Sequence, residues 1–169
     1  MRLIVLAALV AFAPLAARAE TAWDLAKKAA GKAGTGKLEK EVNKRLLDEA
    51  RKNQCSFQSG TDELAKGCDM KAKRLARALI DAKRKLNSSG VQSFKFVVSG
   101  HTDSTGSAER NKELSARRAA VMVRQLVAKG VPESDIESVG MGSEQPLVKP
   151  DDTPAKKARN RRYEVRVKL

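Results

Sequence analysis

The C-terminal end of the chain restricts the possible folds most, because apolar and charged residues alternate there without a break. Tyr163, Val165, Val167 and Leu169 alternate with Arg162, Glu164, Arg166 and Lys168. A period of two predicts a β-strand with one buried face and one exposed face. A strand of this kind needs partner strands and a covering layer, so we expect a sheet with helices packed on it.

The rest of the chain supplies those partners. Phe94, Phe96 and Val98 alternate with more polar neighbours and predict a second strand, and further short strands are expected at 56–58 and 136–142. Apolar residues spaced by three and four predict helices over 63–86 and after the Ser104–Ser107 turn, where Ala119, Met122, Val123 and Leu126 form the buried stripe. Residues 145–158 are expected to be a polar loop. The order predicts an α+β fold, a two-layer α/β sandwich of βαβαβ-β type. Its mixed sheet carries helices on one face and is preceded by an N-terminal helical extension.

The first nineteen residues have the composition of a secretory signal peptide. Arg2 precedes a nearly unbroken apolar run from 3 to 16, and Ala17-Arg18-Ala19 is a small-x-small cleavage site. An uncleaved anchor is the alternative. We therefore expect a signal peptide at 1–19, a basic helical extension or tether at 20–54, and one domain at 55–169. No transmembrane segment is expected after the signal is cleaved.

The extension at 20–54 contains a cluster of glycines. Gly31, Gly34 and Gly36 predict a hinge or break, after which a helix restarts near Leu38 and carries Val42 and Leu46 at four-residue spacing. This apolar stripe is narrow, so a solvated tether is favoured over a docking helix.

Export also determines the chemistry expected of Cys55 and Cys68. In an oxidising compartment these two cysteines predict one disulfide, with two free thiols as the alternative. No cysteine or histidine cluster predicts a metal site, and no cofactor is expected. The net charge of +14 falls to +12 when Arg2 and Arg18 leave with the signal peptide. A surface of this sign attracts anionic lipid, lipopolysaccharide or cell wall, and we expect no nucleic acid as a partner after export. A role in solubility alone is the other interpretation.

Two opposite charges lie where a strand end meets a helix. Asp103 follows the strand at 94–99, and Arg118 shares a helix face with Asn111 and Leu114. Such a pair is most often a structural salt bridge. It can also accept the ammonium and hold the carboxylate of one amino-acid head, with amides near Thr105 assisting. Meso-diaminopimelate is such a ligand in the periplasm.

Four ordered motifs favour the ligand-binding interpretation. They are Gly100-His101-Thr102-Asp103-Ser104-Thr105-Gly106, Asn111 with Leu114-Ser115-Ala116-Arg117-Arg118-Ala119, Gly140-Met141-Gly142 to Pro146, and Asn160-Arg161-Arg162-Tyr163. Together they resemble the OmpA-like peptidoglycan-binding domain from about Phe57 to Leu169. The resemblance implies an OmpA-like sheet and a diaminopimelate site at Asp103, Arg118 and Asn111, to which we add Thr105 from the turn amides. It also implies pocket-supporting roles for Phe57, Gly100, Thr102, Leu114, Asn160 and Arg161.

The chain departs from the family pattern in the first strand. Gln58 stands where an acid is usual and Ser59 where an aromatic is usual, between the two cysteines. Arg110 replaces an aromatic before the helix asparagine. We interpret the expected disulfide as compensation for weaker packing in this segment.

The function expected from these features is non-catalytic binding of peptidoglycan, which would tether or organise the cell envelope. The expected location is the periplasm, with an association with the outer membrane and an envelope protein as a further partner. The alternative is an interaction protein that uses its basic extension to bind an envelope partner or anionic lipid. An enzyme is not expected, because no nucleophile–base pair or paired carboxylates are apparent and His101 is interpreted as a structural residue at the strand end.

Overall fold

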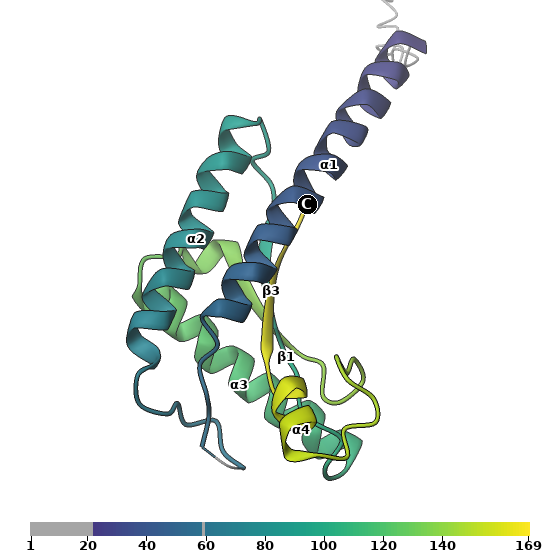
Figure 1. Ribbon diagram of the computed structural model, residues 1–169. Helices are drawn as coiled ribbons and strands as arrows, with labels where there is room; N and C mark the ends of the chain where they lie inside the picture. The colour runs from purple at the N-terminus through teal and green to yellow at the C-terminus, as the bar shows by residue number, and fades with distance from the viewer. Residues whose placement is uncertain (1–21, 59) are drawn as a thin grey trace, which may run out of the picture.

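The computed structural model describes residues 22–58 and 60–169 (Figure 1). The predicted signal peptide, residues 1–19, lies outside the described residues. The elements follow one another in the order α1 (Ala22–Lys52), α2 (Cys68–Ser88), β1 (Lys95–Gly100), α3 (Ala108–Ala128), a 3₁₀ turn (Glu133–Asp135), β2 (Ile136–Gly140), α4 (Pro154–Asn160) and β3 (Tyr163–Lys168). This is the α+β architecture that the alternating pattern predicted.

The three strands form one mixed sheet in the order β2-β1-β3. β1 pairs with β2 in parallel and with β3 in antiparallel fashion, so that Phe96 lies opposite Ile136 on one side and Val167 on the other. Because side chains alternate across a sheet, Phe96, Val98, Val165 and Val167 share one face, and all four are buried. Their neighbours Lys95, Arg166 and Lys168 are exposed on the opposite face. The prediction of helices on one face is confirmed.

Helix α3 packs against β1 and β2 at van der Waals distance because two strand residues lack side chains. A Cβ on Gly100 would lie 2.2 Å from the Ser115 carbonyl oxygen, and one on Gly140 would lie 2.5 Å from the Lys112 carbonyl oxygen. The predicted core positions Ala119, Met122 and Leu126 are completely buried, and Val123 is partly buried against them. The glycines therefore determine how closely the start of α3 approaches the ends of the strands.

Helix α1 is continuous, so the predicted break at the glycine cluster is wrong. The helix runs from Ala22 to Lys52 through Gly31, Gly34 and Gly36. Its backbone bonds are local, and glycine weakens a helix by only about 1 kcal/mol per residue relative to alanine. Figure 1 shows the N-terminal half of the helix extending beyond the rest of the domain.

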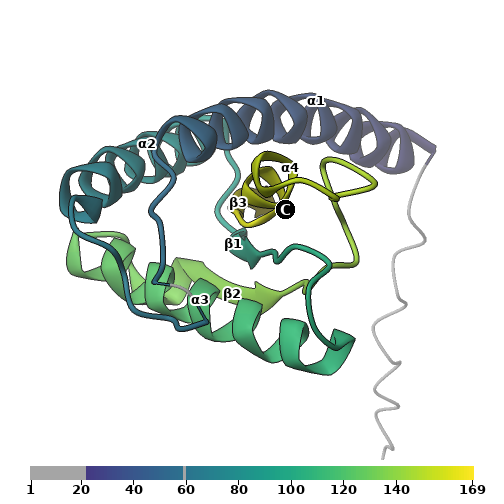
Figure 2. The same ribbon diagram turned by 60° about the horizontal axis from the view of Figure 1, so that its bottom comes forward.

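The C-terminal half of α1 is part of the core. Val42, Leu46 and Ala50 are buried and join the same apolar cluster as α2, α3 and the sheet. The helix lies beside β3 at one edge of the sheet, while α3 lies beside β2 at the other edge (Figure 2). Residues 38–52 therefore pack as an integral layer of the domain, although the predicted boundary at residue 54 separated them from it.

Three smaller expectations are corrected. The strand expected at 56–58 is a single antiparallel bridge between Phe57 and Leu64. The polar loop expected at 145–158 ends in the short helix α4, which Thr153 caps with its side-chain oxygen. Leu169 is 38% exposed because the last strand ends at Lys168.

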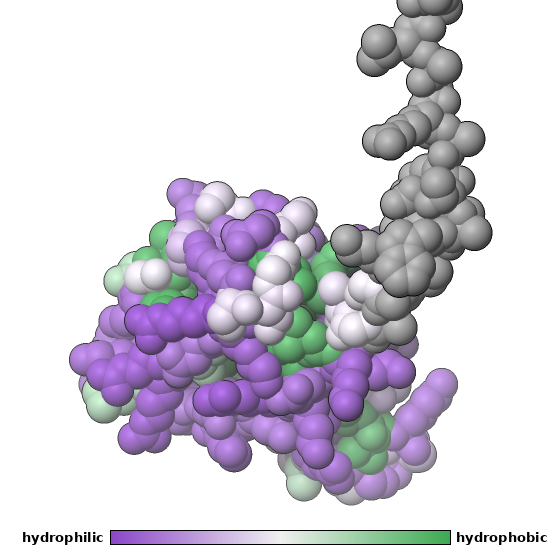
Figure 3. Space-filling view, turned by 90° about the horizontal axis from the view of Figure 1, so that it is seen from above, coloured by the Kyte–Doolittle hydropathy of each residue, from purple (hydrophilic) through white to green (hydrophobic). Residues whose placement is uncertain are grey.

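The face visible in Figure 3 is covered mainly by hydrophilic residues, with smaller hydrophobic areas between them. Among the described residues, no helix is long and apolar enough to cross a membrane.

Candidate ligand-binding cleft

The C-terminal end of β1 opens into a cleft of about 1160 Å³. Its walls come from the turn after β1, the first half of α3, helix α4 with the start of β3, and the loop that follows α1. The predicted site and support residues that line it are Phe57, Gly100, Thr102, Asp103, Thr105, Asn111, Leu114, Arg118 and Arg161. Four segments that are distant in sequence thus meet at one concave surface.

Asp103 is almost buried in this cleft, and both of its carboxylate oxygens accept hydrogen bonds from the protein. Oδ1 accepts the Thr105 amide at 3.0 Å, and Oδ2 accepts Nη1 of Arg161 at 2.8 Å. Burial alone would raise the pKa of this carboxyl, but the hydrogen bonds from Arg161 and Thr105 outweigh it and lower the pKa below its ordinary value. Asp103 is therefore ionised at neutral pH. An ionised carboxylate offers about four acceptor positions in all, so Asp103 keeps acceptor capacity beyond these protein contacts.

Arg118 lies in the same cleft but does not pair directly with Asp103. Its Nε donates to the Thr61 carbonyl at 2.9 Å, its Nη2 donates to the Gln58 carbonyl at 3.3 Å, and the guanidinium carbon lies 5.0 Å from the ring centre of Phe57. Burial is the largest effect that lowers the pKa of Arg118, followed by the nearby Arg161 cation, while Asp103 opposes both. An arginine stays protonated under these conditions.

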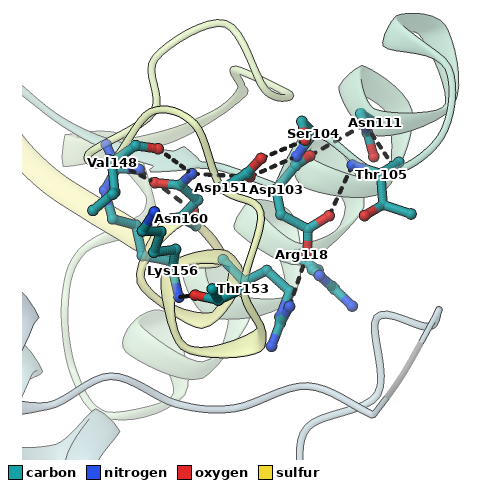
Figure 4. Close-up of polar contacts among 12 residues, drawn as sticks. Asp103, Ser104, Thr105, Asn111, Arg118, Val148, Asp151, Thr153, Lys156 and Asn160 are labelled. Atoms are coloured by element: carbon teal, nitrogen blue, oxygen red, sulfur yellow. Dashed lines mark hydrogen bonds and ion pairs between the residues drawn. The ribbon is translucent and has the colours of Figure 1, made fainter.

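The Nη1 atom of Arg118 has no partner among the described residues, so that side of the guanidinium stays available to a ligand. The loop before α2 thus orients the guanidinium, and Figure 4 shows its place relative to Asp103. The direct partner of Asp103 is Arg161, which the sequence interpretation had assigned only a supporting place. The Asn160-Arg161-Arg162 motif was the signal available for it.

Asn111 holds the turn that carries Asp103. Its Nδ2 donates to the Thr105 carbonyl at 3.0 Å and to the Asp103 carbonyl at 3.4 Å, and the side chain is buried. The Ser107 hydroxyl caps α3 directly after this turn by accepting the Arg110 amide. The Nδ2 of Asn111 is thereby used within the protein, and the residue also lines the cleft beside the turn that it holds (Figure 4).

Asn160 does not line the cleft. It is completely buried, where its Oδ1 accepts the Leu147 and Val148 amides at 2.8 and 3.1 Å and its Nδ2 donates to Asp151 at 3.0 Å. Asp151 in turn accepts the Ser104 amide at 2.9 Å and the Ser104 hydroxyl. The hydrogen bonds from Ser104 and Asn160 lower the pKa of Asp151 to about 2. This chain of contacts ties the loop before α4 to the turn beside Asp103 (Figure 4).

His101 is buried beneath the turn, and neither ring nitrogen has a hydrogen-bond partner within the described part of the chain. Burial, reinforced by the nearby Arg162 cation, lowers its pKa from 6.5 to about 4. The ring is therefore neutral at physiological pH. Residues 22–58 and 60–169 contain no group of three His, Cys, Asp or Glu that could hold a metal ion.

The predicted disulfide joins Cys55 to Cys68, with their Cα atoms 5.1 Å apart. It closes the loop whose Gln58 and Thr61 carbonyls hold Arg118 and whose Phe57 lies against the guanidinium. Cys55 lines the cleft and Cys68 begins α2. The altered first strand of the sequence is thus a disulfide-closed wall of the cleft.

The fold and cleft define a small α+β domain that presents an ionised aspartate and an arginine on one concave surface. The sequence matches the OmpA family over residues 57–161, and the chain belongs to that family. The peptidoglycan-binding protein ArfA of Mycobacterium bovis is 42% identical over 71 residues, which cover 42% of this chain and 22% of that protein. The peptidoglycan-associated lipoprotein of Pseudomonas aeruginosa is 39% identical over 72 residues, covering 43% of this chain and 42% of the relative. The chain thus matches less than half the length of either relative.

A solved structure supports the fold. The periplasmic domain of Helicobacter pylori MotB superposes with a TM-score of 0.54 at 23% identity and covers 67% of this chain and 69% of that one. The names of the two sequence relatives describe binding to or association with peptidoglycan and no reaction. The chain thus has the OmpA-family fold that the sequence indicated.

Proposed function

We propose that the protein binds peptidoglycan without cleaving it, by holding the diaminopimelate of the stem peptide in the cleft between Asp103 and Arg118. Two of the similar proteins are named for binding to or association with peptidoglycan. The observation that carries the proposal is that an ionised Asp103 and the open Nη1 of Arg118 line one cleft.

The chemistry suits an amino-acid head. The ligand ammonium donates to the acceptor positions that Asp103 keeps beyond its bonds to Thr105 and Arg161. The ligand carboxylate accepts from the open side of Arg118. The Thr105 amide already serves Asp103, so Thr105 acts by shaping the carboxylate. Asn111 and Asn160 act one step further out by holding the turn and the loop.

Retention on isolated peptidoglycan sacculi tests the proposal. Asp103→Asn and Arg118→Lys should each reduce retention about tenfold to a hundredfold, the effect of losing a hydrogen bond to a charged group. Arg117→Lys is the matched control, because Arg117 is adjacent, exposed, paired with Glu113 and outside the cleft. Equal retention of the wild type, both cleft variants and the control would refute the proposed site.

The signal-peptide pattern of residues 1–19 leads us to propose also that the protein is exported to the periplasm and lies near the outer membrane. Detection of the mature chain in a periplasmic extract, with Glu20 as its first residue, would support this location. A chain that remains in the cytoplasm at full length would refute it.

A second candidate function rests on the part of α1 that extends beyond the domain (Figure 1). This basic segment can contact an envelope partner or anionic lipid while the cleft holds the wall. Deleting all of 20–54 would remove the core residues Val42, Leu46 and Ala50, so the informative deletion is 20–36. An unchanged set of crosslinked partners in that variant would rule the candidate out.

A further inference from the structure

The charged residues around the cleft are of nearly one sign. Among the residues that the structure describes, its lining contains a single carboxylate, Asp103, and seven cationic side chains: Arg51, Arg110, Arg118, Lys157, Arg159, Arg161 and Arg162. They come from the end of α1, the first turn and the middle of α3, helix α4, and the two residues that join α4 to β3. A cleft concentrates the field of such charges more strongly than a flat surface does.

Some of these cations have protein partners. Arg161 pairs with Asp103 at 2.8 Å, Arg162 pairs with Glu164 at 2.7 Å, and Arg118 is held by two carbonyls. Arg51 lies 3.8 Å from the exposed carboxylate of Asp48.

The remaining three cations are available for a ligand. Within the described chain, the side chains of Arg110, Lys157 and Arg159 form no hydrogen bond or ion pair. Arg110 and Arg159 are exposed, and Lys157 is half-buried. Arg110 belongs to α3, while Lys157 and Arg159 belong to α4, so the three lie on different walls of the cleft.

An isolated amino-acid head does not account for this excess of positive charge. The charges of the ammonium and the carboxylate in a zwitterion cancel, and Asp103 and Arg118 already provide one partner for each of these groups. A ligand that gains from Arg110, Lys157 and Arg159 must bring further anionic groups close to its head. A stem peptide has such groups in the free carboxylates outside the diaminopimelate head.

We infer that Arg110, Lys157 and Arg159 select stem peptides whose carboxylates outside the diaminopimelate head are free, and disfavour stems in which those carboxylates are amidated. This inference rests on the proposed function and adds a preference within the same site. A carboxamide carries no charge and offers the three cations only a neutral acceptor, so amidation removes the attraction and leaves the zwitterionic head unchanged.

Calorimetric titration with two synthetic stem peptides tests this preference. Both carry the same unmodified diaminopimelate, but one has D-isoglutamate before it and the other D-isoglutamine. The wild type should bind the carboxylate form about fivefold more tightly, the effect of one partly exposed charge pair. In the triple variant Arg110→Gln, Lys157→Gln, Arg159→Gln the ratio should fall to about one, and raised salt should reduce it in the wild type.

Arg117→Gln is the control, because it removes one cation outside the cleft and should keep the wild-type ratio. Equal wild-type affinity for the two peptides would overturn the inference and leave the proposed function standing. A triple variant that keeps the wild-type preference would overturn the assignment to these three residues. Absence of binding to either peptide would refute the proposed function itself.

Discussion

Replacing both Cys55 and Cys68 with alanine should destabilise the domain and, separately, weaken its ligand binding. The two sulfurs are buried and join positions that are 13 residues apart. Cross-linking a loop of this length stabilises a protein by about 3 kcal/mol, chiefly by restricting the unfolded chain. In a domain of this size that corresponds to a decrease in Tm of about 10 °C.

The effect on binding follows from the contacts of Arg118. Its Nε and Nη2 donate to the carbonyls of Thr61 and Gln58, and Phe57 lies against its guanidinium. All three residues lie in the disulfide-closed loop. When the loop is released, Arg118 regains side-chain freedom worth up to about 2 kcal/mol, and we expect the affinity for diaminopimelate to fall about tenfold.

Thermal unfolding measures the first effect, and titration with diaminopimelate well below the lowered Tm measures the second. A double-mutant cycle with Arg118→Lys separates them, because loss of the disulfide should cost no further affinity once Arg118 is gone. Reductant should reproduce both effects in the wild type and change nothing in the cysteine-free variant. A folded double-alanine variant with wild-type affinity would show that the loop does not orient Arg118.

Further predictions concern the sheet and its edge. The pKa of His101 is lowered from 6.5 to about 4 in the folded state, so the unfolded chain binds a proton more readily between these two values. The stability that the neutral ring contributes is therefore complete above pH 6.5 and is lost as the pH falls towards 4. The free energy of unfolding should decrease by at most about 3 kcal/mol over this window. Urea titrations of His101→Gln should show a shallower loss over that window, and identical slopes would contradict this account. Gly140→Ala would place a Cβ 2.5 Å from a carbonyl oxygen of α3 and should lower the free energy of unfolding by at least about 2 kcal/mol. Gly34→Ala has open space around it in α1 and should leave the stability unchanged or raise it. Calorimetry measures both changes. The side-chain amides of Asn43 and Gln54 bond to the backbone of β3 at the edge of the sheet. Substituting both residues with alanine should lower the free energy of unfolding by about 1–3 kcal/mol in total and promote self-association, which analytical ultracentrifugation measures. A stable, monomeric double variant would exclude a role of these residues in protecting the sheet edge.

Local periodicity was enough to predict the elements whose two faces differ. The alternation along β3 and the three-four spacing of Ala119, Met122 and Leu126 each report one buried face, and the structure buries those faces. The order of the predicted strands and helices then indicated a mixed sheet. The glycine-rich part of α1 was predicted incorrectly, because a composition signal worth about 1 kcal/mol per residue does not determine whether a helix with a packed C-terminal half continues.

The candidate cleft was predictable only in part. The motifs identified Asp103 and Arg118, and both line the cleft. The partner of Asp103 was not predictable from spacing, since Arg161 follows it by 58 residues and reaches it only after β3 has paired with β1. The backbone carbonyls that accept from Arg118 could not be predicted either, because every residue has a carbonyl and the sequence does not show which one makes a contact. Contacts between distant segments determine the geometry of the site, and they depend on the completed fold.

The edge of β3 explains why α1 packs where it does. The strand at 56–58 is reduced to one bridge, and no described strand pairs with the outer side of β3. Two side-chain amides occupy that edge, Asn43 from α1 and Gln54 from just after it. Asn43 accepts the Val167 amide at 2.6 Å and donates to the Val167 carbonyl at 3.1 Å. Gln54 accepts the Tyr163 amide at 3.1 Å and donates to the Tyr163 carbonyl at 2.7 Å. An amide side chain offers one donor and one acceptor, as a strand residue does. These residues therefore satisfy the edge-facing backbone groups of Tyr163 and Val167 as a neighbouring strand would, and they hinder another chain from pairing there. The same helix ends beside the cleft, where Arg51 and Gln54 line the wall next to the disulfide-closed loop. The segment before residue 55 thus protects the sheet edge and completes the cleft, so a fragment that begins at residue 55 should lose both stability and ligand affinity.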